Sequence, residues 1–154
     1  MDHAAFCLIF SHAKTLSRKG AILSSQIENI AKIVVDAGFH IHKDLGPGLL
    51  ESVYEAVLSY ELEHRGLKVE RQKPVKIKYR DIILEEGFRA DLIVGNVLLV
   101  ELKSVERFQA VHGKQVLTYL RLLDLPLGLL INFGAATFKE GIKRIANNHN
   151  NFAP

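Results

Sequence analysis

The sequence predicts an α/β fold in which helices pack on a mixed sheet, and three of its features carry that prediction. Apolar residues recur with helical spacing over residues 27–41. Residues 75–80 instead alternate between apolar and basic side chains, as strands with one exposed face do. A nearly continuous apolar run at 127–133 is typical of a strand buried on both faces. Helices and strands share one chain of 154 residues, a length that fits a single domain.

Two helices are expected before the first strand. Ser25-Gln26-Ile27-Glu28 has the pattern of a capping box. The helix that it opens should end near Leu45, because Gly46-Pro47-Gly48 cannot continue it. A second helix is expected over residues 49–65, with Glu51 in its first turn. Its predicted inward stripe has helical spacing and consists of Leu50, Val53, Tyr54, Val57, Leu58 and Leu62.

The remaining elements follow from alternation, turn signals and apolar runs. They are strands at 67–80, 82–94 and 97–104, a helix at 108–123 and a strand at 127–133. Gly95-Asn96 between two apolar runs is a hairpin signal for the second and third strands. Thr137-Phe138-Lys139-Glu140 is a second capping box and predicts a last helix, with Phe138, Ile142 and Ile145 facing inward. The predicted order is ααβββαβα.

The ends of the chain fit this pattern poorly. Residues 1–20 contain a short apolar run without a preceding basic segment, so they make a poor signal peptide and are expected to be a tail or an extra packed segment. Residues 148–154 are expected to be a frayed polar tail. The predicted domain is therefore 21–147.

Composition narrows the classes of function. The net charge of +3 permits nucleic-acid binding without requiring it. Cys7 is the single cysteine, which excludes an internal disulfide and a cysteine-based zinc site. No apolar run is long enough to cross a membrane, so we expect a cytoplasmic protein without a membrane partner.

Three charged residues, Asp91, Glu101 and Lys103, interrupt the apolar runs of the predicted hairpin. Charges inside such strands are costly to bury unless they are paired or bind a metal. Two converging carboxylates can bind Mg²⁺ or Mn²⁺ through oxygen, and a nearby lysine can orient water or neutralise charge on phosphorus. The alternative is an edge hairpin whose charges are solvated.

The order of these residues, an aspartate followed ten residues later by Glu-x-Lys, resembles the motif of the PD-(D/E)XK nuclease superfamily, with Ala90 in place of its proline. Upstream, Gly48, Glu51 and Tyr54 resemble the hallmark of the GxxExxY family, a branch of that superfamily. The resemblance covers about residues 26–147. It implies a restriction-endonuclease-like αβββαβ core, here with an extra N-terminal helix and a C-terminal helix, and nuclease activity.

The resemblance also implies a role for each residue of the motif. Asp91, Glu101 and Glu51 would bind the metal, and Lys103 would complete the catalytic set. Helix N-termini favour negative charge, so the alternative for Glu51 is that it only satisfies its helix. Tyr54 is expected to be half-buried packing rather than a catalytic acid.

Gln115 and Tyr119 are four residues apart and should share a helical face. They resemble the Gln-x-x-x-Tyr motif that follows the catalytic strand in several nucleases of the superfamily. By that resemblance they would hold Lys103 or a phosphate. The alternative is the edge of an amphipathic helix.

The first predicted strand is strongly basic. Residues 71–80 carry five positive charges and no acid. Four of them are candidate nucleic-acid contacts that would follow the phosphates: Lys73, Lys76, Lys78 and Arg80. The alternative is a solvated face that protects an edge strand from aggregation.

The connection within the hairpin decides whether the proposed metal site can exist. A two-residue loop would pair Val94 with Val97 and send Asp91 and Glu101 to opposite faces of the sheet. A three-residue loop, Gly95-Asn96-Val97, would pair Asp91 with Glu101 directly. A β-bulge near Asp91 is the other solution. The nuclease hypothesis requires one of the last two.

The leading functional hypothesis is a metal-dependent nuclease that acts on nucleic acid. DNA is the first candidate substrate, and RNA is the second. A second hypothesis is a non-catalytic nucleic-acid-binding or assembly module with the same fold. A third is a structural protein whose charged residues pair with one another. Because the chain has no separate DNA-reading domain, it would act as a homodimer or with a partner.

Overall fold

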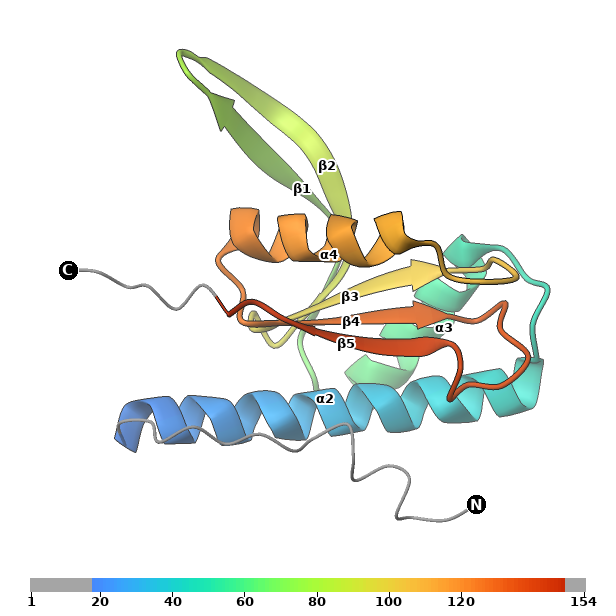
Figure 1. The fold of residues 1–154 in the computed structure, drawn as a ribbon. Helices are drawn as coiled ribbons and strands as arrows, with labels where there is room; N and C mark the ends of the chain where they lie inside the picture. The colour runs from blue at the N-terminus through green and yellow to red at the C-terminus, as the bar shows by residue number, and fades with distance from the viewer. Residues whose placement is uncertain (1–17, 149–154) are drawn as a thin grey trace.

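The computed structural model describes residues 18–148, which form a five-stranded mixed sheet with helices on both faces (Figure 1). The predicted α/β class with a restriction-endonuclease-like arrangement is confirmed. The helices are α2 (Arg18–Leu45), α3 (Glu51–His64) and α4 (Ala110–Leu123). The strands follow one another across the sheet in chain order: β1 (Val69–Tyr79), β2 (Ile82–Val94), β3 (Leu98–Lys103), β4 (Leu127–Asn132) and β5 (Ile142–Ala146). Only β3 and β4 are parallel neighbours.

Two apolar clusters lie on opposite faces of the sheet. The larger joins α2 and α3 to one face and contains Tyr54, Leu102 and Phe133. The smaller joins α4 to the other face and contains Leu99 and Leu130. β4 is buried along its whole length, as its continuous apolar sequence predicts.

The first helix begins earlier than predicted. Its end at Leu45 is confirmed, but it starts at Arg18, so the predicted capping box lies inside it. The Ser25 hydroxyl donates backwards to the carbonyl oxygen of Ile22 (2.9 Å) instead of capping a helix start. Glu28 forms an ion pair with Arg144 of β5. Residues 18–20 of the predicted N-terminal tail therefore belong to α2, and residues 1–17 and 149–154 lie outside the described residues.

The buried stripe of α3 is rotated from the predicted one. Tyr54, Leu58 and Leu62 of the predicted stripe face inward and are fully buried, but Leu50 is 73% exposed and Val53 is 39% exposed. Leu50 precedes the helix, which starts at Glu51. The stripe turns instead towards Glu55 and Ser59, whose polar side chains are buried. A polar residue could occupy the inward face because other elements supply its hydrogen bonds, which the local spacing of apolar residues does not reveal.

The prediction of a C-terminal helix is wrong, because residues Ile142–Ala146 form strand β5. The Thr137 hydroxyl does exchange hydrogen bonds with Glu140, but the chain turns through Gly141 and enters strand β5. Ile142 packs in the cluster of α2 and α3, and Ile145 packs in that of α4. A spacing of three residues suits one face of a helix or the two faces of a strand. The strand is formed because β5 supplies backbone partners to the outer edge of β4.

The hairpin between β2 and β3 has a three-residue loop, which is one of the two connections that the nuclease hypothesis allows. Val94 pairs with Leu98 and Leu92 with Val100, which leaves Gly95, Asn96 and Val97 in the connection. Gly95 and Asn96 have φ angles of +60° and +59°, in the left-handed region that glycine and asparagine tolerate best. The register therefore brings Asp91 to the same cross-strand level as Glu101.

This loop provides a test of the fold. A Cβ atom at Gly95 would lie 2.7 Å from Cδ1 of the buried Ile30, in addition to the cost of positive φ. We expect Gly95→Ala to lower the free energy of unfolding by about 1–3 kcal/mol in urea titrations. The matched control is Asn96→Gly, which keeps the left-handed conformation without a clash. Equal stability losses in the two variants would contradict this account of the loop.

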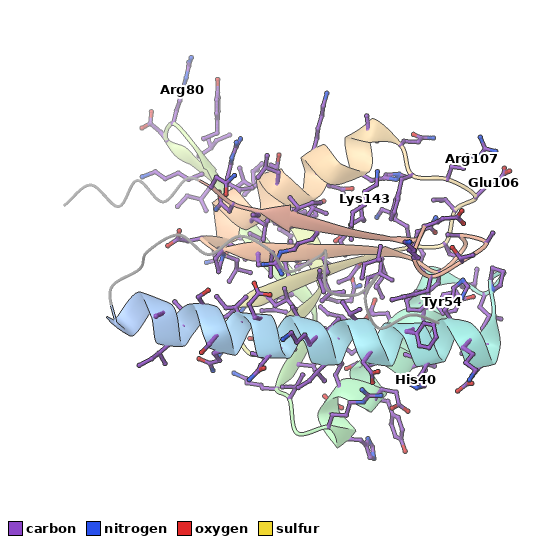
Figure 2. The ribbon with its side chains drawn as sticks, turned by 60° about the horizontal axis from the view of Figure 1, so that its bottom comes forward. His40, Tyr54, Arg80, Glu106, Arg107 and Lys143 are labelled. Atoms are coloured by element: carbon purple, nitrogen blue, oxygen red, sulfur yellow. The ribbon has the colours of Figure 1, made fainter. Side chains whose placement is uncertain are left out.

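β1 and the first part of β2 form a hairpin arm that extends beyond α4 and the rest of the sheet (Figure 1). Arg80 lies at the far end of this arm, well separated from Tyr54 (Figure 2). The distal arm exposes Tyr79, Ile82, Ile83 and Leu84 to solvent. None of the helices described here is long and apolar enough to span a membrane.

Candidate active site

The candidate site lies where the arm separates from the rest of the sheet. β2 pairs with β3 only over residues 92–94, and before that it pairs with β1 alone. Leu92 and Val100 are the last pair of the short β2–β3 ladder, and Asp91 and Glu101 are the next residues on the two strands. We call the point where β2 and β3 diverge, just after the pair of Leu92 and Val100, the fork. A carboxylate from each strand lies there.

Asp91 is held by two hydrogen bonds. Its Oδ2 accepts the backbone N–H of Leu102 (2.9 Å), and its Oδ1 accepts the side-chain amide of Gln72 (3.1 Å). Burial raises the pKa of the Asp91 carboxyl, and the Leu102 N–H and the charge of Lys103 offset part of that rise. The side chain thus bridges β2 and β3 where their backbones no longer pair.

Glu101 is an incompletely paired buried acid. It is 4% exposed, and its Oε1 accepts a hydrogen bond from the Lys103 ammonium (3.0 Å). Its Oε2 is the one buried side-chain atom, among the described residues, that has no hydrogen-bond partner. Burial, and then the charge of Asp91, raise the pKa of Glu101 to about 7, against the opposing effect of Lys103. A buried carboxylate oxygen without a hydrogen-bond partner destabilises the fold, so a ligand bound to Glu101 Oε2 would stabilise it.

Lys103 ends β3 and remains positively charged at neutral pH. Burial by itself would lower its pKa, but the charge and hydrogen bond of Glu101, followed by the charges of Glu51 and Asp91, raise the pKa above its usual value. A charged ammonium is therefore fixed beside the two carboxylates.

Glu51 approaches the same place from α3. It is the first residue of that helix, and its Oε1 accepts the backbone N–H of Ser104 (3.2 Å). The Ser104 hydroxyl donates to the carbonyl oxygen of Leu49 (2.6 Å). These bonds join the start of α3 to the end of β3. The charge of Glu51 raises the pKa values of both Glu101 and Lys103.

The donor set fits a divalent cation that prefers oxygen ligands. Within residues 18–148, no three His, Cys, Asp or Glu side chains gather closely enough to hold an ion by themselves. Asp91 and Glu101 would therefore be two protein ligands, with water in the remaining positions. The unpaired Glu101 oxygen and the acid–acid repulsion are the features that such a cation would relieve.

A sequence model of the PD-(D/E)XK nuclease superfamily matches residues 28–145. The chain belongs to the PD-(D/E)XK nuclease superfamily. The match includes strands β2 and β3, which carry Asp91 and Glu101, and helix α3, which carries Glu51. The searches of curated proteins and of solved structures found no match.

Around this superfamily core, the other predicted site residues are placed as follows. Gln115 donates to the hydroxyl of Tyr119 (2.5 Å), and the Tyr119 ring stacks on Phe88 of β2 (3.6 Å between centroids). This pair does share a helical face, and its hydrogen bond joins its two members. Tyr54 is fully buried rather than half-buried, and its hydroxyl donates to the carbonyl oxygen of Gly46 (2.6 Å). Its ring stacks on Phe133, so it holds the glycine turn that precedes α3.

The four predicted cationic contacts lie along β1 and its turn. Two of them have acidic partners: Lys73 lies 3.0 Å from Glu70, and Lys76 lies 2.6 Å from Glu85. Arg80 lies over the ring of Tyr79. Lys78, like Arg80, is exposed. Glu70 belongs to β1 itself, whereas Glu85 is brought alongside the strand by β2, so the positive charge of β1 is partly balanced from both strands.

Sequence reasoning missed a second polar group at the fork. Glu55 on α3 is buried and accepts hydrogen bonds from Arg71 (2.9 Å) and Gln72 (2.6 Å) of β1. Glu55 lies four residues after Glu51, so their shared helical side was a visible signal. The position of Gln72 opposite Asp91 depends on strand register, which the sequence did not specify.

A cavity of about 670 Å³ opens after the ends of β3 and β4, and its lining includes none of the four proposed catalytic residues. Asn132, which pairs with Lys103 across the parallel ladder, forms part of its wall. Arg107, Phe108 and Lys143 also line it, and Figure 2 shows Arg107 and Lys143 at this end of the sheet. Ligands of sheet proteins commonly bind beyond the carboxyl ends of parallel strands.

Proposed function

We propose that the protein is a metal-dependent nuclease that hydrolyses phosphodiester bonds. DNA is the proposed substrate, and RNA is the alternative. The observation that carries the proposal is the unpartnered buried oxygen of Glu101 beside a second carboxylate and a charged lysine. Buried polar side-chain atoms are nearly always hydrogen-bonded, so an oxygen without a partner supports a site that takes a ligand. Membership of the GxxExxY branch, based on Gly48, Glu51 and Tyr54, is part of this proposal.

Asp91 and Glu101 would hold Mg²⁺ or Mn²⁺ at the fork, and Glu51 would act on the ion through its charge from α3 rather than as a third direct ligand. When bound, such an ion supplies a water of lowered pKa and neutralises charge on the phosphate. The Lys103 ammonium would donate to a phosphoryl oxygen, where negative charge develops. Asp91 is held by the Leu102 N–H, so the site is oriented before substrate arrives.

The substrate strand would pass the fork between the arm and the cavity. Lys78 and Arg80 are exposed cations on the arm, and Lys73 and Lys76 would exchange their acidic partners for phosphates. Arg107 and Lys143 offer positive charge in the cavity. Gln115 and Tyr119 would support the path from α4. We propose a cytoplasmic protein that acts as a homodimer or with a partner.

Calorimetric titration with Mn²⁺ tests the metal site. We expect Asp91→Asn and Glu101→Gln each to weaken Mn²⁺ binding by more than about tenfold, because even residues outside the ligand shell commonly cost 10–100-fold. The matched control is Asp36→Asn on α2, which removes an exposed carboxylate that pairs with Arg65 (2.6 Å).

Cleavage of single-stranded DNA, duplex DNA and RNA is measured on the same proteins. Activity that survives Asp91→Asn would indicate a contaminating nuclease. Wild-type protein that binds nucleic acid but no Mn²⁺ would favour the non-catalytic nucleic-acid-binding or assembly module.

A further inference from the structure

Gln72 occupies an unusual position between two acids. Its Nε2 atom donates to Oε2 of Glu55 (2.6 Å) and to Oδ1 of Asp91 (3.1 Å). A primary amide nitrogen has two N–H donors, so each carboxylate receives one. Because both partners accept only, the amide has a single orientation that satisfies them.

Glu55 is the anchor of this arrangement. It is 5% exposed, and both of its oxygens are engaged, Oε1 by Arg71 (2.9 Å) and Oε2 by Gln72. Arg71 balances the charge of the buried carboxylate, so Glu55 need not be neutralised by another ligand. Its position on α3, one turn after Glu51, ties the helix to β1.

The backbone at Gln72 is held in an uncommon conformation. Its φ angle is +48°, which residues other than glycine seldom adopt within a strand. The β1–β2 ladder pairs Arg71 with Leu92 and Lys73 with Ala90, and the intervening pair, Gln72 and Asp91, is not made. Such conformations persist where the surroundings over-determine them, and they concentrate at functional sites.

We propose that Glu55 and Gln72 are positioning residues that hold the Asp91 carboxylate in the orientation needed to bind a divalent cation. Gln72 and the Leu102 N–H take one lone pair from each Asp91 oxygen, from β1 and β3. The remaining lone pairs stay available for a ligand. The inference rests on the proposed function for its catalytic consequence, but the orientation of Asp91 can be measured without metal or substrate.

The experiment compares Gln72→Met, which keeps the length of the side chain but removes the amide, with Glu55→Gln. In Glu55→Gln the new amide group must face either Arg71 or the Gln72 amide, so one donor opposes another. The matched control is Gln26→Met, an exposed position on α2. Urea unfolding of each protein separates local from global effects.

The first readout is hydrogen exchange of the Leu102 amide in metal-free protein, followed by NMR. We expect exchange at least about tenfold faster in both variants, relative to the amides of β4, because Asp91 is then held from one side only. The second readout is Mn²⁺ affinity, expected to fall about 10–100-fold, with kcat lowered and KM for the nucleic acid unchanged. The double variant Glu55→Gln/Gln72→Met should bind Mn²⁺ no more weakly than the single variant with the lower affinity.

Two results would overturn the inference. One is an unchanged Leu102 exchange rate in both variants. The other is a uniform rise of exchange at all amides with loss of stability and unchanged Mn²⁺ affinity, which would make Glu55 and Gln72 only a link between α3 and β1. If Leu102 responds as expected while the wild type neither binds Mn²⁺ nor cleaves, the positioning of Asp91 stands and the nuclease proposal fails.

Discussion

Replacing Lys103 with methionine is expected to lower the rate of phosphodiester cleavage by about 100–1,000-fold, the usual cost of removing a group that stabilises developing charge. Lys103 carries its charge at neutral pH because Glu101 raises its pKa against the effect of burial. The affinity for Mn²⁺ should stay the same or increase, since the variant frees Glu101 Oε1 from its hydrogen bond. Single-turnover cleavage with saturating Mn²⁺, together with calorimetry, measures the two quantities separately.

The control for this variant is Lys139→Met, at an exposed position in the turn before β5. It removes the same charge from the chain without touching the fork. If Lys103→Met cleaves as fast as Lys139→Met, the ammonium takes no part in the reaction. If it loses Mn²⁺ binding instead, the residue shapes the metal site rather than stabilising the phosphate.

The second large effect concerns stability and pH. The folded-state pKa of Glu101 is about 7, above its usual 4.5, so the folded protein binds that proton more tightly than the unfolded chain. The stability that protonated Glu101 contributes to the folded protein is fully present below pH 4.5, and it is lost as the pH rises to about 7. At about 1.4 kcal/mol per pH unit, wild type should lose about 3 kcal/mol relative to Glu101→Gln across this range.

Urea unfolding from pH 4.5 to 7.5 in metal-free buffer measures this difference. Asp91, whose pKa is also raised, is present in both proteins, so the difference between the profiles reports Glu101 together with its coupling to Asp91. The titration of Lys103 lies above the range. Saturating Mg²⁺ should flatten the wild-type profile and leave the variant unchanged, because the ionised carboxylate then has a partner. Parallel profiles in metal-free buffer would contradict a buried, unsatisfied Glu101.

The sequence by itself determined the parts of the fold that depend on local periodicity and turn chemistry. The end of α2 and the buried β4 were predictable from glycine positions and from the apolar run, and strand parity reduced the connection of the hairpin to two possibilities. Parity also showed that Asp91 and Glu101 share a face only with a three-residue loop or a β-bulge between them, and the structure has the loop. These features depend on residues close in the chain, whose geometry repeats with a fixed period.

Only the tertiary structure decided which elements supply partners over a long range. Ile142 and Ile145 suit a helix or a strand equally well, and the open edge of β4 selected the strand. Glu55 could face inward because Arg71 and Gln72 of another element satisfy its oxygens. Lys76 is paired with Glu85, an acid of the neighbouring strand β2 that only folding brings near. The physical reason is common to all of them: the cost of burying a polar group or leaving a backbone edge open depends on distant segments, which a local pattern does not specify.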